Sequence, residues 1–202
     1  FWIAQFSTAL LAAHQIVFQY VCFIITLAFA MSQAVTVRVG HAVGRQDLHG
    51  VRYATYVGMG LNGIFSLFII IAFYLIPNFF LRLDIDIYNP ANAVLVRDAA
   101  LLLGISGVLM LFDNFRIIGF GALRGLKDTK FPMYTSLISF WLVGLTCAYL
   151  FSFILSFGGQ GIWWGLTIGI GCGALIVFVR IQYLLKRVDL NKIMGNTASV
   201  AH

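Results

Sequence analysis

The sequence is poor in charged residues. Only 10% of its 202 residues are Asp, Glu, Lys or Arg, whereas 61% are hydrophobic; a soluble domain usually carries about 25% charged residues. Glutamate is absent altogether, so all seven acidic residues are aspartates. So few charges cannot cover a water-facing surface. This excludes an ordinary soluble domain and predicts that lipid is the outer solvent.

The sequence also lacks the side-chain groupings that carry out catalysis or bind structural metals. Its three cysteines are scattered through apolar runs, at Cys22, Cys147 and Cys172. An odd number at these spacings fits neither a disulfide framework nor a metal site. No nucleophile–base pair stands at helical spacing. We therefore predict a protein that is not an enzyme and that carries no cofactor.

Long uncharged runs dominate what is present. A helix rises about 1.5 Å per residue, so about 20 apolar residues cross the roughly 30 Å hydrocarbon core. Charged segments and a Gly158–Gly161 turn separate five complete spans, preceded by a helix remnant at residues 1–8. Because unpaired backbone cannot face lipid, each span should be a helix. The expected fold is an all-α polytopic transmembrane bundle with spans at residues 10–37, 53–81, 99–123, 131–157 and 161–185.

Basic residues are distributed unequally between the two sides of this bundle. The connections after the first and third spans and the C-terminal segment together hold ten Lys and Arg residues, whereas the opposite side holds only Arg82 and Arg97. The positive-inside rule therefore places residues 45–49, residues 127–130 and the 189–202 tail in the cytoplasm. This bias explains the net charge of +6 without a nucleic-acid partner.

Glycines mark places where helices should approach one another closely. Two junctions, Gly40–Asp47 and Gly121–Asp128, share a pattern of glycines four residues apart, a basic residue and then Asp. We expect each Asp to cap the helix that follows. In the fifth span, glycines recur at every fourth position and predict a tightly packed helix face, at Gly161, Gly165, Gly169 and Gly173.

Five segments taken in order along the chain resemble one family of transporters. They are LAAHQI (11–16), SQAVTVRVG (32–40), GRQD (44–47), GALRGLKDT (121–129) and GQGIWWGL (159–166). Together they are similar to the second half of a multidrug and toxic-compound extrusion (MATE) transporter. The resemblance implies an antiporter of the bacterial inner membrane with two six-helix lobes. Residues 1–202 would form the C-terminal lobe, without the N-terminal lobe that is its partner, as expected also from a chain that begins in mid-helix.

Asp113 is the acidic residue expected inside a span. It lies 11 residues before Arg124, or roughly 16 Å along the helix from the inner interface. An ionisable group at that depth usually has a function. The family resemblance implies that this Asp takes part in binding the coupling cation, Na⁺ or H⁺, with Asp113 as a ligand if the ion is Na⁺.

Arg116 departs from the resemblance, because similar proteins usually have an uncharged amide at that position. It lies one helical turn after Asp113 on the same face, so a structural ion pair is the alternative to a coupling role. Its fixed positive charge would hold Asp113 ionised and repel cations.

Other side chains in the spans are candidates for lining a substrate cavity. Ser106 lies two turns before Asp113 and shares its face, whereas Asn114 is turned away by about 100°. Together with Arg116, the candidates are Asn114, Ser106, Trp141, His14 and Gln15.

For several of these side chains a structural role is the alternative to a role in transport. His14 and Gln15, near the outer end of the first span, could simply contact another helix. Trp141, near the middle of the fourth span, could hold an aromatic cation or face lipid or the core. Trp163 and Trp164 follow the outer turn and are expected in an interfacial aromatic belt.

The sequence thus predicts a secondary active transporter that exports bulky organic cations or drugs in exchange for Na⁺ or H⁺. Its expected partners are membrane lipid, the N-terminal lobe and small organic cations. The alternative is a flippase of lipid-linked saccharides or lipids with the same broad fold. Arg116 supports this alternative, because such pores favour anions.

Overall fold

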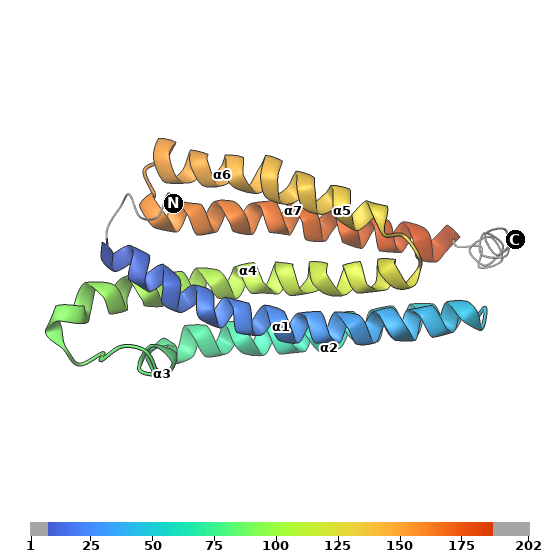
Figure 1. Cartoon of the computed structure of the whole chain (residues 1–202), viewed down its shortest axis with the longest axis horizontal. Helices are drawn as coiled ribbons and strands as arrows, with labels where there is room; N and C mark the ends of the chain where they lie inside the picture. Colours follow the sequence, from blue (N-terminus) through green and yellow to red (C-terminus); the bar gives the residue numbers. More distant parts are fainter. Residues whose placement is uncertain (1–7, 188–202) are drawn as a thin grey trace, which may run out of the picture.

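The computed structural model describes residues 8–187, and every regular element in this part of the chain is a helix. Five helices are long and apolar enough to cross a membrane. They lie side by side along the longest axis of the molecule (Figure 1). The predicted all-α bundle with five complete spans is therefore confirmed. The predicted 189–202 tail and residues 1–7 of the helix remnant lie outside the described residues.

The five spans are built from the following elements. They are α1 (Thr8–Gly44), α2 (Leu48–Leu75), the short α3 (Pro77–Leu81), a 3₁₀ turn η2 (Pro90–Asn92) that leads into α4 (Ala93–Gly125), a fourth span made of α5 (Lys130–Leu137), η3 (Ile138–Gly144), α6 (Leu145–Tyr149) and η4 (Leu150–Ile154), and α7 (Gly158–Arg187).

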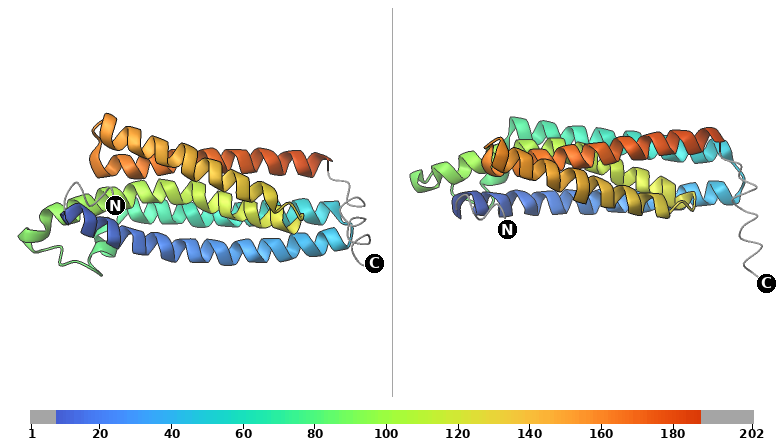
Figure 2. Two further views of the ribbon diagram at one scale, coloured as in Figure 1. Left: turned by 45° about the horizontal axis from the view of Figure 1, so that its top comes forward. Right: turned by 90° about the horizontal axis from the view of Figure 1, so that it is seen from above.

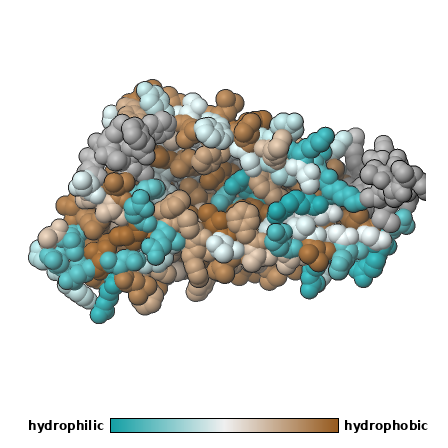
Figure 3. All heavy atoms as spheres, in the orientation of Figure 1, coloured by the Kyte–Doolittle hydropathy of each residue, from teal (hydrophilic) through white to brown (hydrophobic). Residues whose placement is uncertain are grey.

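Helix α4 is the centre of the bundle. It packs against α1, α2 and α7, and the fourth span packs against α7. The views in Figures 1 and 2 agree that the α1–α2 hairpin and the hairpin of the fourth span with α7 flank α4. Apolar side chains cover the middle of the molecule, and polar side chains gather toward its two ends (Figure 3). This distribution is the one expected for helices that cross a bilayer.

Most span boundaries differ from the prediction by a few residues. Helix α2 ends at Leu75 rather than at residue 81, because Pro77 lacks an amide hydrogen and disfavours helical backbone at the preceding residue. Helix α1 continues to Gly44, since residues 38–44 contain charge and two glycines but no proline. The outer turn falls at residues 155–157, before the Gly158–Gly161 segment, where Ser156 adopts a φ of 58°.

The glycine face of α7 packs directly on the backbone of the fourth span. A Cβ atom added at Gly161 would lie 2.7 Å from the carbonyl carbon of Phe151, and one at Gly165 or Gly169 would overlap the backbone of the same span. This confirms the predicted close packing. The fourth span itself contains two π-helical stretches, η3 and η4, where the sequence predicted a regular helix.

The two glycine-containing hairpins have the same backbone structure. Gln46 and Lys127 both have a positive φ, and the amides that follow them, of Asp47 and Asp128, each donate a 2.9 Å hydrogen bond to a carbonyl five residues back. This is the Schellman pattern of helix ends. The capping prediction is confirmed for Asp47, whose carboxylate accepts from the Gly50 amide at 2.8 Å.

The capping prediction is wrong for Asp128. Helix α5 begins at Lys130 without a side-chain cap, so Asp128 stands one residue too early to cap it. Its carboxylate instead accepts two hydrogen bonds from Arg180 of α7, at 2.8 and 3.0 Å. This pair ties the α4–α5 hairpin to the end of α7.

Candidate functional site

Asp113 lies on the central helix and is shielded on several sides. It is only 4% exposed. Its neighbours on α4 include buried apolar residues on both sides, Met110 and Ile117. A carboxylate in such surroundings is costly unless it is paired or hydrogen-bonded.

Arg116 provides that partner. Its Nε donates to Asp113 Oδ1 at 3.0 Å, and its Nη2 donates to the same oxygen. The ion pair foreseen from the one-turn spacing is therefore present. Arg116 has two further neighbours: its Nη1 lies 3.4 Å from the Ser136 hydroxyl of α5, and its guanidinium lies 5.1 Å from the centre of the Phe120 ring. The pair thus connects α4 with the fourth span.

Two serines of the fourth span were missed by sequence reasoning. Ser136 contacts Arg116, and Ser139 lies against α7, where a Cβ at Gly173 would be 2.7 Å from its Oγ and 3.3 Å from Arg116 Cδ. The Ser139 hydroxyl is buried and has no hydrogen-bond partner within the described residues. Their three-residue spacing could have indicated them, because it puts both hydroxyls on one face of an apolar span.

Asn114 belongs to a different polar group, between α4 and α2. Its Nδ2 donates to the Ser66 hydroxyl at 2.9 Å, on a side of α4 other than the one that carries the ion pair, as the 100° offset predicts. Asn62, one turn before Ser66, is fully buried, and neither polar atom of its amide has a partner within the described part of the chain. Asn114 is thus not brought together with Asp113.

Ser106 and His14 have local roles. The Ser106 hydroxyl donates to the Leu103 carbonyl of its own helix at 2.7 Å. The His14 ring meets the Trp163 ring edge-on at a centroid distance of 5.5 Å, which joins α1 to the start of α7. Trp163 is buried at 4% exposure, so the interfacial-belt prediction is wrong for it, because the packing of α1 covers its ring. Trp164 is exposed.

Gln15 and Trp141 point outward. Gln15 is exposed on α1, and Trp141 is 65% exposed on η3, where its ring contacts that of Phe140. The described part of the chain therefore brings neither side chain to the ion pair.

The site therefore consists of the buried Asp113 carboxylate, and its counter-ion is the Arg116 guanidinium of the same helix. No group of three His, Cys, Asp or Glu side chains gathers anywhere in residues 8–187, so Asp113 is not part of a multi-residue metal-ligand cluster in this part of the chain. A Na⁺ ion, a proton or an organic cation that binds Asp113 shares the carboxylate with Arg116, whose two hydrogen bonds both go to Oδ1.

Known proteins with similar sequences belong to one group. The MatE family model matches residues 1–150. The probable multidrug resistance protein NorM of Pseudomonas putida is 38% identical over 178 residues, which cover 88% of this chain and 38% of that protein. The multidrug resistance protein NorM of Burkholderia vietnamiensis is 37% identical over 174 residues, covering 84% of this chain and 37% of that protein. The chain thus spans less than half the length of these relatives.

Solved structures share the fold at low sequence identity. The eukaryotic MATE transporter AtDTX14 superposes with a TM-score of 0.75 at 18% identity, over 93% of this chain and 40% of that one. An outward-facing multidrug resistance MATE transporter of the MOP superfamily gives 0.77 at 17% identity, over 87% and 38%. With the family model matching residues 1–150, the chain belongs to the MatE family, and the relatives and solved structures it resembles are named as multidrug resistance proteins and transporters rather than as enzymes.

Proposed function

We propose that the chain is the C-terminal lobe of a secondary active transporter that exports bulky organic cations or drugs in exchange for Na⁺ or H⁺. Its relatives are named for multidrug resistance, and they are bacterial proteins, which supports a place in the bacterial inner membrane. The N-terminal lobe would supply the other half of the substrate cavity.

The observation that carries the proposal is the buried Asp113 carboxylate on the central helix. It is the one acidic residue within the five predicted spans, and it is 4% exposed. An ionisable group held at that depth defaults to a role in moving ions or substrates. We assign it the coupling of the cation.

Arg116 makes this coupling competitive. The guanidinium neutralises the Asp113 carboxylate and occupies its Oδ1, so a cation competes with it for the negative charge. Ser136 and the Phe120 ring already lie beside the guanidinium and can keep it partly satisfied when it leaves the carboxylate. In this mechanism Asp113 alternates between its own arginine and the transported cation.

The flippase alternative loses its main support. It rested on Arg116 as a positive charge that attracts anionic substrates. In the structure that charge is neutralised by Asp113, so the pair leaves no net positive charge to select an anion. A cation antiporter accounts better for a carboxylate at this position.

Transport by the full-length protein tests the proposal. In everted membrane vesicles, Asp113→Asn should abolish the export of fluorescent organic cations driven by a Na⁺ or pH gradient, because an amide cannot exchange a proton or neutralise a cation. The matched control is Ser106→Ala, whose hydroxyl bonds only within α4 and which should retain export. Export by Asp113→Asn at the wild-type rate would remove Asp113 from the mechanism.

A further inference from the structure

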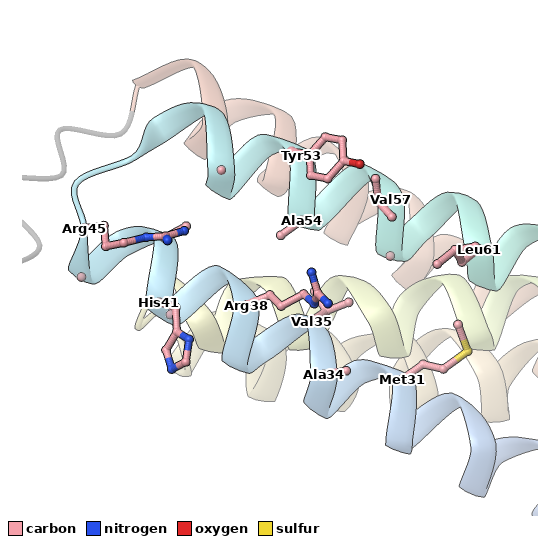
Figure 4. A pocket seen from close by; sticks show the side chains of 15 residues that line it. Met31, Ala34, Val35, Arg38, His41, Arg45, Tyr53, Ala54, Val57 and Leu61 are labelled. Carbon is pink, nitrogen blue, oxygen red and sulfur yellow. The ribbon is translucent and has the colours of Figure 1, made fainter.

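A groove separates the halves of α1 and α2 that lie next to their hairpin. It has a volume of about 970 Å³ and is lined by residues between 31 and 44 of α1, by Arg45 just beyond it, and by residues between 50 and 61 of α2. Figure 4 shows it from close by. We call it the α1–α2 groove. It is separate from the Asp113–Arg116 pair, which faces the fourth span.

The groove is wide near the hairpin because several residues that line it there are small. A Cβ at Gly58 would run into the Val35 side chain, so the two helices nearly touch there. Toward the hairpin the facing positions are small, and Gly40 and Gly44 have nothing within 4 Å of where a Cβ would stand. The deeper walls are apolar, and both Val57 and Leu61 are exposed large hydrophobic side chains.

The hairpin end of the groove is positively charged. Arg38 lies two turns before the end of α1, and Arg45 directly follows its last residue while its amide still bonds to the His41 carbonyl. The seven-residue spacing therefore keeps the two arginines on one side of this end, about 10 Å apart. Figure 4 shows both guanidinium groups in the space between α1 and α2, whereas the His41 ring points away from α2.

These two arginines have no anionic partner in the described part of the chain. Neither side chain forms a hydrogen bond or an ion pair with another residue between 8 and 187. Elsewhere the half-buried arginines are engaged; Arg180, for example, donates to the Asp128 carboxylate at 2.8 and 3.0 Å. The single acid between residues 31 and 61 is Asp47, and its carboxylate caps α2.

The groove has the length and polarity of one lipid leaflet. From Gly44 to Met31 it extends thirteen residues, or about 20 Å along α1, and half of a bilayer's hydrocarbon core is about 15 Å thick. The arginines therefore stand at headgroup level, and the walls at Val57 and Leu61 stand beside the acyl chains. Basic pockets between transmembrane helices at this level suit anionic lipid headgroups.

We propose that the α1–α2 groove is a specific binding site for an anionic phospholipid, whose phosphate lies between Arg38 and Arg45 and whose acyl chain lies along Val57 and Leu61. Charge complementarity with the unpartnered arginines selects an anionic over a zwitterionic headgroup. The apolar walls select a lipid over a free phosphate. The site does not depend on the proposed transport cycle.

Lipid titration of the full-length protein in detergent tests the proposal. Dioleoylphosphatidylglycerol should raise the thermal unfolding temperature at lower concentrations than dioleoylphosphatidylcholine does, and glycerol phosphate should give no such rise. Arg38→Gln with Arg45→Gln should weaken the phosphatidylglycerol effect on the order of 30-fold. The matched control is Lys127→Gln with Lys130→Gln, which removes two charges at the same end of the bundle but outside the groove and should keep the effect.

A second pair of variants distinguishes binding in the groove from a general attraction of anionic lipid to surface charge. Gly40→Leu places a side chain in the open groove, and Gly60→Leu places one in open space on α2 outside the groove lining. Gly40→Leu should weaken phosphatidylglycerol binding with both arginines intact, whereas Gly60→Leu should not. Equal stabilisation by the two lipids, equal loss in the lysine control, or full stabilisation by glycerol phosphate alone would each overturn the proposal.

Discussion

Arg116 is hydrogen-bonded to the Asp113 carboxylate one turn earlier on α4 and, at the same time, lies 3.4 Å from the Ser136 hydroxyl of α5. One side chain thus joins the buried acid of α4 to a second helix. A change at Asp113 therefore affects both the charge of the site and the contact between two helices, and the two effects can be separated experimentally.

Removing the carboxylate alone should destabilise the protein. Asp113→Asn leaves the Arg116 guanidinium without its counter-ion, and breaking one side of a buried pair costs about 3 kcal/mol. The double variant Asp113→Asn with Arg116→Gln should recover most of this loss. Unfolding by denaturing detergent measures both. If the double variant is as unstable as the single one, the pair is not what holds this region together.

Removing the arginine should strengthen cation binding. Without the tethered guanidinium, Arg116→Gln frees Asp113 for the transported cation. The apparent affinity for the coupling ion should rise about tenfold, which corresponds to about 1.4 kcal/mol of competing interaction. The dependence of export on Na⁺ concentration and on pH identifies which ion responds. Arg97→Gln, an exposed arginine at the opposite end of α4, serves as the control. An unchanged affinity in Arg116→Gln would contradict the competitive mechanism.

The ion pair could be predicted from the sequence because its members are three residues apart on one helix. The contacts of Arg116 with Ser136, and of Asp128 with Arg180, join residues that are 20 and 52 positions apart. They depend on how the helices pack, which apolar periodicity does not determine. The same limit explains Trp163: its position after a turn predicted an interface, but α1 covers it through His14. The lengths of the hydrophobic runs predicted the number of spans correctly. The predicted end of the second span was wrong because the effect of Pro77 on the helix was not considered.

The glycine face of α7 should not tolerate larger side chains. Gly165→Leu or Gly169→Leu would drive a side chain into the backbone of the fourth span. Because backbone cannot move aside as a flexible side chain can, we expect a loss of at least about 3 kcal/mol and a low yield of folded protein. Gly63→Leu is the matched control, since nothing lies within 4 Å of its added Cβ. Size-exclusion profiles of the detergent-solubilised variants measure the folded fraction, and normal profiles for both α7 variants would show that this contact is dispensable.

The orientation of the bundle is the remaining prediction from the sequence, and it can be measured on positions that the structure describes. His49, exposed near the start of α2, should face the cytoplasm, and Ala91, exposed in the connection before α4, should face the outside, because basic residues are concentrated at the hairpin end. Cys22, Cys147 and Cys172 are first replaced by alanine, since all three are free thiols. A membrane-impermeant maleimide should then label Ala91→Cys in intact cells, and His49→Cys only after the membrane is opened. Labelling of His49→Cys from outside would reverse the topology. The α1–α2 groove would then face the outer leaflet.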